Sequence, residues 1–158
     1  GASLPLRSAS CDAGTPDASG APPGWRIAVY GAQPEVALDE PAPGLRGNAL
    51  RIAATDDSDT AIYQDVAAQA GAWYQLTAWV RTEDLTADTR IYGAVCACDG
   101  PAPYCSSPNR AGTTPWGEAT IRFRAPASGV LRVAIFLVGF GKGTGAVWFD
   151  DLRVRIVD

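Results

Sequence analysis

The sequence predicts an all-β protein, a jelly-roll β-sandwich of two antiparallel sheets in a single domain. Two observations carry this prediction. About nine short segments are rich in β-branched and aromatic residues, and many of them alternate apolar with polar side chains. Clusters of Gly, Pro, Asp and Ser separate these segments, and no stretch shows the period of a helix. Short strands separated by frequent turns are typical of a sandwich.

The chain divides into an arm and a sandwich. Residues 1–24 are rich in Ser, Ala, Pro, Gly and Asp, which predicts an irregular N-terminal arm with one short strand near Leu6 to Cys11. Residues 25–158 form the predicted sandwich, and residues 67–71 predict a strand end followed by a turn. The strands are expected at 25–30, 35–39, 49–55, 61–66, 73–81, 90–97, 118–125, 130–138 and 146–157.

Two segments between the strands need separate interpretation. The run from Asp56 to Asp59 predicts a turn between two strands, because Asp favours turns; a second cation-binding loop is the alternative. The segment 139–145, GFGKGTG, predicts a flexible hairpin whose Phe140 and Lys142 are candidates for the rim of a binding site. It does not fit a phosphate-binding loop, because Gly143 follows the lysine where Ser or Thr is required.

The charge of the chain excludes several kinds of partner and chemistry. The formal net charge is −4, and the 13 Lys and Arg residues are spread singly along the sequence. We therefore expect no nucleic-acid partner, and the lack of a long apolar run predicts no membrane span.

The absence of His excludes Ser-His-Asp and Cys-His catalysis and histidine zinc sites. The chain also has no Met, and we expect it to belong to a longer protein with neighbouring domains.

The four cysteines indicate disulfides and an oxidising compartment, because their number is even and three of them lie in one short segment. We predict that Cys98–Cys105 closes this segment and that Cys11–Cys96 is the second bond. Cys96 and Cys98 share a strand face two residues apart, which is an awkward geometry for bonding each other. A zinc site is the alternative, although a C-x-C pair fits the usual zinc knuckles badly.

Alternation within the strands predicts a core face and a second face that mixes aromatic with polar side chains. In segment 73–81, Trp79 and Arg81 share the second face with Trp73 and Gln75. An indole stacks on the apolar face of a sugar ring while guanidinium and amide groups bond its hydroxyls, so this face predicts a sugar-binding surface. The residues expected in the core include Tyr74, Leu76, Ala78, Val80, Ile121, Phe123, Val133, Ile135, Leu137, Trp148 and Phe149.

A series of short motifs runs through most of the chain. The motifs are Gly24 with Trp25, Trp116, and the segments 8–14, 47–50, 62–66, 70–81, 123–126 and 148–152. In this order they resemble the galactose-binding-like carbohydrate-binding modules, the grouping of families four, nine and twenty-two, over residues 8–156. Two departures are visible: Cys11 stands where those modules usually have Phe, and segment 96–105 has no counterpart in them.

The resemblance implies a non-catalytic carbohydrate-binding module of a secreted or cell-surface bacterial protein, with an oligo- or polysaccharide as partner. It also implies a structural Ca²⁺ that ties the first strand to the last. Asp12 matches the acidic position of the opening motif and Asp150 or Asp151 the terminal one, with Asp39, Glu40 or nearby carbonyls completing the set of oxygen ligands. The alternative is that Asp150 and Asp151 cap a strand.

The ligand site is expected at Trp79 and Arg81. The flanking candidates are Tyr30, Gln64, Tyr92, Trp25 and Trp116. Burial in the core is an equal expectation for each aromatic among them, and Gln64 is equally expected as a core amide. Two other functions stay open: a structural or adhesive domain with no small ligand, and a glycan-cleaving enzyme. The enzyme is disfavoured because, apart from the chain ends, no strand places two carboxylates on one face.

Overall fold

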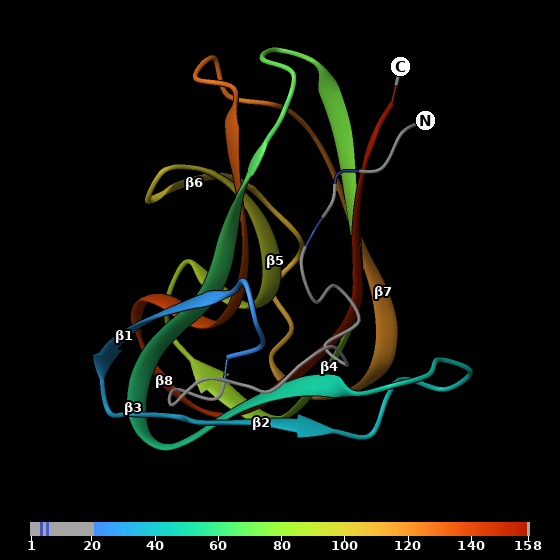
Figure 1. Cartoon of the computed structure of the whole chain (residues 1–158). Helices are drawn as coiled ribbons and strands as arrows, with labels where there is room; N and C mark the ends of the chain where they lie inside the picture. The colour runs from blue at the N-terminus through green and yellow to red at the C-terminus, as the bar shows by residue number, and fades with distance from the viewer. Residues whose placement is uncertain (1–3, 5, 7–20, 158) are drawn as a thin grey trace.

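The computed structural model describes residues 4, 6 and 21–157, and this part contains eight strands and no helix (Figure 1). The strands are β1 (Arg26–Gly31), β2 (Glu35–Asp39), β3 (Ala49–Ala67), β4 (Trp73–Ala87), β5 (Ile91–Asp99), β6 (Ala102–Ser106), β7 (Gly112–Arg124) and β8 (Val130–Ile156). All their pairings are antiparallel. The predicted all-β class is therefore confirmed.

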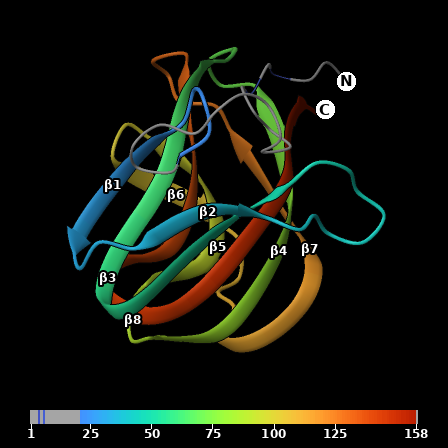
Figure 2. The same cartoon turned by 60° about the horizontal axis from the view of Figure 1, so that its bottom comes forward.

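Two layers share the long strands β3 and β8. In the first layer the order is β1, residues 58–67 of β3, residues 130–138 of β8, β5 and β6. In the second layer it is β2, residues 49–54 of β3, residues 143–156 of β8, β4 and β7. Figures 1 and 2 show the two long ribbons bending as they pass between the layers.

Two predicted turns are wrong, because both segments are bends within a long strand. Residues 56–59 lie inside β3, where the register with β8 shifts between Ala54 and Ser58. Residues 139–145 lie inside β8 and do not close a hairpin, since the parts of β8 on either side pair with β3 in different layers. Gly143 permits this crossing, because a side chain there would collide with the backbone oxygen of Thr86.

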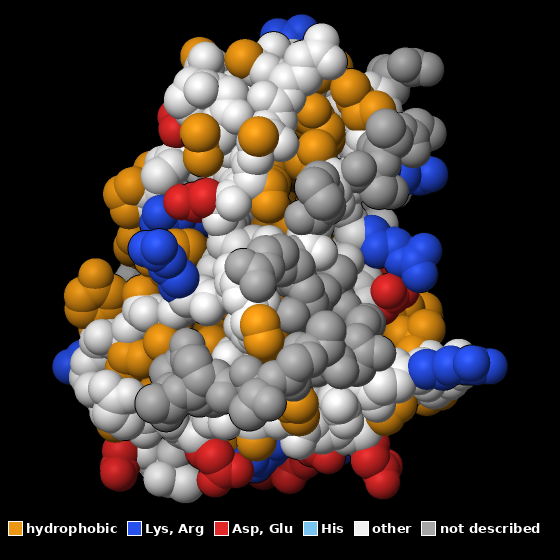
Figure 3. Space-filling view, viewed as in Figure 1, with side chains coloured by type: hydrophobic (Ala, Val, Ile, Leu, Met, Phe, Trp, Pro, Cys, Tyr) orange, Lys and Arg blue, Asp and Glu red, His pale blue; other side chains and the backbone are white. Residues whose placement is uncertain are grey.

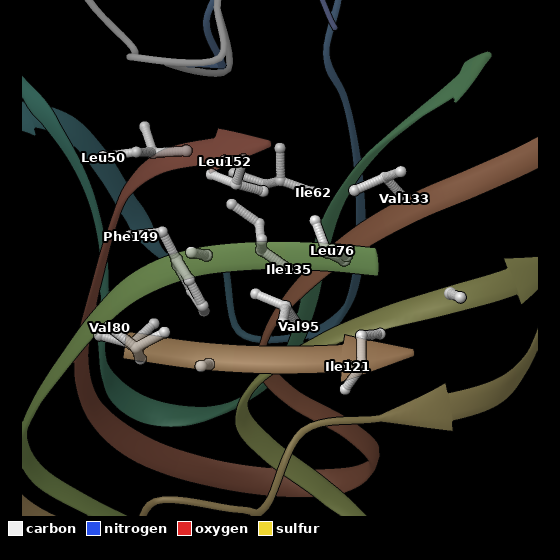
Figure 4. Close-up of a cluster of buried hydrophobic side chains, with 14 of the residues drawn as sticks. Leu50, Ile62, Leu76, Val80, Val95, Ile121, Val133, Ile135, Phe149 and Leu152 are labelled. Atoms are coloured by element: carbon white, nitrogen blue, oxygen red, sulfur yellow. The ribbon is translucent and has the colours of Figure 1, made fainter. Parts of the chain in front are cut away.

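The core between the layers is aliphatic and aromatic, as the alternation predicted. Its largest fully buried members are Phe149, Leu50, Ile52, Ile62, Leu76, Leu85, Leu131, Ile135, Leu137, Leu152, Val80 and Val95. Figure 4 shows 14 of the core side chains and labels ten of them, which come from both layers. Tyr74 and Phe123 belong to the same cluster, with ring centroids 6.4 Å apart. Trp148 is buried too, but on the outer face of the second layer.

The predicted Cys98–Cys105 disulfide is wrong, because Cys96, Cys98 and Cys105 carry free thiols. Residues 102–106 form β6, a strand that the sequence did not predict. In the β5–β6 register Cys105 lies opposite Ala97 and packs against the main core. Cys96 and Cys98 belong to a separate cluster on the outer face of the first layer. The predicted partners thus point to opposite faces of the sheet.

Most of the predicted N-terminal arm lies outside the described residues. Cys11 and Asp12 are among the residues not described, as is segment 7–11 of the expected first strand. Leu4 lies beside the end of β8, where its backbone N–H donates to the carbonyl oxygen of Val154 at 2.8 Å.

Candidate functional site

A groove of about 390 Å³ crosses the outer face of the first layer. Its aromatic and charged walls are formed by Tyr30, Tyr63, Phe136, Phe140, Asp59 and Arg132. We call this hollow the aromatic groove. It extends over β1, β3 and β8 and reaches β5 at Cys98.

Small side chains make the floor of the aromatic groove. Ala28 of β1 pairs with Ala61 of β3, and Ala134 of β8 pairs with Tyr63 of β3. These residues face outward because side chains alternate along a strand, and the neighbouring positions carry the core. Alanines in adjacent strands leave a depression between larger neighbours. The local sequence therefore creates the floor of the hollow, and Gly100 and Pro101 of the β5–β6 turn complete its lining.

Two exposed aromatic side chains stand at one end of the groove. Tyr30 is 69% exposed and Phe140 is 51% exposed, although both are large apolar groups. Tyr30 lies opposite Asp59 in the β1–β3 register. Phe140 lies 6.4 Å from Phe136, measured between ring centroids, and the Arg90 guanidinium carbon is 5.1 Å from its ring centroid. Exposed aromatics beside a hollow are typical of ligand-binding surfaces.

Phe140 is held in a backbone conformation that L-residues rarely adopt, with φ of 63°. Two side chains fix this bend. The backbone N–H of Gly141 donates to Asp59 Oδ2 at 3.3 Å. Thr89 Oγ1 lies 2.7 Å from the carbonyl oxygen of Gly139 and 2.8 Å from that of Phe140. Strained residues persist where surrounding contacts determine them, often at functional sites.

Asp59 contributes a carboxylate to the same end of the groove. Burial raises the pKa of this carboxyl, while hydrogen bonds from the backbone N–H groups of Gly141 and Phe140 oppose the rise. The side chain thus both supports the Phe140 bend and presents oxygen to the hollow.

The opposite end of the groove is built around Arg132. Its guanidinium binds Asp65 through two hydrogen bonds, Nε to Oδ1 at 2.8 Å and Nη2 to Oδ2 at 3.1 Å. The hydrogen bonds to Asp65 raise the pKa of Arg132. The guanidinium carbon also lies 4.0 Å from the ring centroid of Tyr63. This pairing holds a cation and an aromatic ring in fixed positions.

Cys98 places a thiol of low reactivity at the floor of the aromatic groove. Burial raises the pKa of Cys98 to about 12, and burial likewise raises that of its neighbour Cys96. The thiolate is the nucleophilic and metal-binding form of cysteine, so these thiols stay unreactive at neutral pH.

The structure distributes the predicted ligand residues over three places. Tyr30 lies at the aromatic groove, whereas Trp79, Arg81 and Trp116 lie on the outer face of the second layer. The remaining three, Trp25, Gln64 and Tyr92, are turned towards the interior. Trp25 is 4% exposed and Gln64 is 5% exposed.

Arg81 is engaged within the protein. Its guanidinium carbon lies 4.1 Å from the ring centroid of Trp148, and its Nη2 lies 3.6 Å from a Glu83 carboxylate oxygen. Arg51 approaches the same indole at 5.5 Å. Trp79 instead lines a separate depression of about 500 Å³, together with Gln75, Thr77, Glu118, Asp151, Arg153 and Arg155.

The predicted calcium ligands have other partners. Asp39 Oδ2 accepts the indole N–H of Trp148 at 2.8 Å, Asp150 Oδ2 accepts the backbone N–H of Ala42 at 3.0 Å, and Asp151 pairs with Arg153. Among the described residues, no group of three or more His, Cys, Asp or Glu is suited to hold a metal ion. Because Asp12 is not described, calcium stays a prediction.

Sequence reasoning named Phe140 and Lys142 as rim candidates but missed Tyr63, Phe136, Asp59 and Arg132. A signal for them was present. On each of three strands an alanine and an aromatic residue lie two positions apart, so their side chains point to the same face of the sheet. The pairs are Ala28 with Tyr30, Ala61 with Tyr63, and Ala134 with Phe136. Register between the strands was needed to bring these pairs together.

No protein-family model and no curated protein matches the chain, but solved structures do. A family 4 carbohydrate-binding module, titled "CBM4 structure and function", has a TM-score of 0.65 and 16% identity, covering 97% of this chain and 100% of its own. The module TmCBM61, in complex with β-1,4-galactotriose, has a TM-score of 0.60 and 16% identity over 88% of this chain and 92% of its own.

Two of the matching structures belong to enzymes. A cyclase from Fischerella sp. TAU, in complex with 4-(1H-indol-3-yl)butan-2-one, has a TM-score of 0.63 and 15% identity over 99% of this chain and 98% of its own. The enzymatically active domain of tailspike protein 4 from bacteriophage CBA120 has a TM-score of 0.62 and 11% identity over 85% of this chain. This chain spans only 20% of that protein. The likenesses show that the chain has the β-sandwich fold of carbohydrate-binding modules.

Proposed function

We propose that this chain is a non-catalytic carbohydrate-binding module that holds a neutral oligosaccharide in the aromatic groove. The observation that carries the proposal is the pair of exposed rings, Tyr30 and Phe140, beside a hollow that also presents Asp59 and Arg132. Sugar rings offer apolar C–H faces and polar edges, so they match rings flanked by hydrogen-bonding groups. The fold shared with carbohydrate-binding modules supports the same assignment.

The expected affinity follows from the contacts available. Stacking that removes about 100 Å² of apolar surface from water contributes about 2.5 kcal/mol. Each net hydrogen bond adds about 1 kcal/mol, and immobilising the ligand costs several kcal/mol. The balance gives a Kd in the micromolar to millimolar range, about −4 to −8 kcal/mol. Longer oligosaccharides that engage both ends of the groove should bind more tightly than single sugars.

The described residues that line the groove include no pair of carboxyl groups of the kind that glycan cleavage uses. Glycosidases use two carboxyl groups about 5–10 Å apart on either side of the scissile bond. Among the residues that line the groove, Asp59 is the one carboxylate, and it is bonded to the Phe140 bend. The nearby Asp65 is occupied by Arg132. Binding without cleavage is therefore the function that the groove supports best.

An extracellular setting belongs to the same proposal, because polysaccharides of this kind are met outside the cell or at its surface. No helix in the described part of the chain has the length and apolar character to cross a membrane.

The test is affinity electrophoresis against soluble neutral polysaccharides, including β-1,4-galactan, xylan and β-glucan, followed by calorimetry with the oligosaccharide of the best binder. We expect Tyr30→Ala to raise the Kd about tenfold or more, since it removes one stacking platform. The matched control is Tyr104→Ala, which removes a 46% exposed tyrosine from β6, outside the groove. It should leave the Kd unchanged.

Two results would contradict the proposal. If no polysaccharide binds the wild-type domain at millimolar sugar concentration, the domain is structural or adhesive. If Tyr30→Ala and Tyr104→Ala lose affinity equally while both remain folded, the ligand does not lie in the aromatic groove.

A further inference from the structure

The outer face of the second layer carries a second arrangement, in which a neutral row lies between two basic rows. Strand β4 presents Trp73, Gln75, Thr77 and Trp79 on this face. On one side β7 places Arg122 opposite Gln75 and Arg124 opposite Trp73. On the other side β8 places Arg153 opposite Thr77 and Arg155 opposite Gln75. We call this surface the arginine face.

Strand geometry sets the dimensions of the arginine face. The two arginine rows are separated by two strand spacings, about 10 Å, and the arginines within a row are about 7 Å apart. The depression of about 500 Å³ lies over Gln75, Thr77 and Trp79, and it is also lined by Arg153, Arg155, Glu118 and Asp151. Trp73 lies on the same strand face beyond the depression and is 41% exposed. The surface therefore combines a depression at Trp79 with an exposed indole further along β4.

The arginine face concentrates positive charge on an acidic protein. It holds four of the 13 Lys and Arg residues of a chain whose net charge is −4. Arg153 pairs with Asp151, whereas Arg124 and Arg155 form no ion pair with another described residue. Figure 3 shows basic side chains on the side of the molecule where β7 and the end of β8 lie. Like charges so closely placed repel one another, which favours an anionic ligand between them.

Two of the arginines are also positioned by an aromatic ring. The guanidinium carbons of Arg122 and Arg124 lie 5.6 Å and 5.3 Å from the ring centroid of Trp73. Contact with the ring limits the freedom of both side chains, so less entropy is lost when they bind an anion.

We propose that the arginine face is a second binding site, which takes an acidic polysaccharide carrying carboxylate or sulfate groups. The chain lies along β4, with sugar rings over Trp73 and Trp79 and acidic groups bound by the arginines on either side. Guanidinium groups bind carboxylate and sulfate oxygens through paired hydrogen bonds. This site is on the opposite layer from the aromatic groove and does not depend on it.

The charge spacing favours a polysaccharide over nucleic acid. Duplex DNA carries one charge per about 1.7 Å of its axis, a density that four arginines do not match. A polyuronate carries one carboxylate per sugar ring, a lower charge density that is better suited to arginines about 7 Å apart. Glu118 and Asp151 border the same depression and would repel a densely charged strand, while they offer hydrogen-bond acceptors to sugar hydroxyls.

The test measures binding of the intact domain to polygalacturonate, to dextran sulfate and to neutral dextran by affinity electrophoresis and calorimetry at low ionic strength. We expect one or both acidic polymers to bind, with the preferred polymer showing whether carboxylate or sulfate is recognised, and neutral dextran not to bind. The double variants Arg122→Gln/Arg124→Gln and Arg153→Gln/Arg155→Gln should each raise the Kd about tenfold or more. The single variants Arg124→Gln and Arg155→Gln break no ion pair with a described residue, and each should also raise the Kd if a double variant fails to fold.

The controls separate a built site from general attraction. Arg26→Gln/Arg46→Gln removes the same charge from other exposed positions and should change the Kd less than twofold. Tyr30→Ala should leave binding of the acidic polymer unchanged. The proposal is overturned by equal losses in the control double variant, by loss in Tyr30→Ala, by tighter binding of oligothymidylate than of either acidic polymer, or by no acidic polymer binding at all.

Discussion

Trp148 lies between Arg51 and Arg81, and its indole N–H donates to Asp39 Oδ2. The sequence analysis expected Trp148 in the core; the residue is buried, but on the outer face of the second layer, and its surroundings were not predicted. Which side chains flank a residue depends on the register of the neighbouring strands, and Arg51, Trp148 and Arg81 lie in one row across three strands. The sequence alone did not show that Arg81 lies beside Trp148, so Arg81 was expected to contact a ligand. In the structure its guanidinium packs on the Trp148 indole.

Asp39 should make the stability of the fold depend on pH. The hydrogen bond from Trp148 and the one from the backbone N–H of Glu40 lower the pKa of Asp39. A carboxyl whose pKa is lower in the folded state stabilises the fold above its unfolded pKa, about 3.9, and loses this contribution as the pH falls through the folded value.

We therefore expect Asp39→Asn to be less stable than the wild type at pH 7, with a difference that shrinks below about pH 4. Urea unfolding from pH 7 to pH 2 measures this. The same difference between the two proteins at every pH would show that the charge of Asp39 has no role.

At the scale of the elements, the sequence predicted the paired segments better than their connections. Residues 61–66 and 130–138 were recognised as strands, and their alternation correctly separated the core residues from those that face outward. The bends were missed because Asp-rich and Gly-rich segments favour a tight turn and a bend alike. Only the pairing of β3 and β8 across both layers distinguishes the two.

Gly143 should be indispensable to the bend in β8. A Cβ atom there would collide with the backbone oxygen of Thr86 and come within 3.0 Å of Ala87 Cβ. We expect Gly143→Ala to lower the free energy of unfolding by roughly 3 kcal/mol, the upper part of the range for overpacking. The matched control is Gly44→Ala, where no atom lies within 4 Å but φ is +82°. That change should cost only about 1 kcal/mol of backbone strain. Gly143 has no positive φ, so a loss no larger than that of Gly44→Ala in urea unfolding would show that the close approach of Thr86 does not limit this position.

Considered as a whole, the molecule presents two different outer faces. The aromatic groove combines exposed rings with one carboxylate and one guanidinium, whereas the arginine face combines two indoles with four guanidinium groups and is bordered by the carboxylates of Glu118 and Asp151. Basic residues that are spread singly along the sequence come together on one face because β4 lies between β7 and β8. Composition could not reveal this clustering, since it requires strands distant in sequence to pair.

The prediction of a sugar-binding surface rested on Trp79 and Arg81, which lie on the outer face of the second layer, whereas the groove that we propose for a neutral sugar lies on the first layer. Tyr30 is the member of the predicted set that lies at the aromatic groove. The pairing of β1 with β3 and of β3 with β8 supplies the rest of that groove, and these long-range pairings are not encoded in any local motif.

Residue-resolved NMR tests the central claim, binding of a neutral oligosaccharide in the aromatic groove, most directly. The ¹⁵N-labelled domain is titrated with the oligosaccharide selected by the polysaccharide screen, and amide shifts are followed along the chain. The account predicts saturable shifts centred on Tyr30, Ala61 and Phe140, with the amides of β4 and β7 unaffected. Shifts confined to β4 and β7, or no shifts at millimolar sugar, would contradict it.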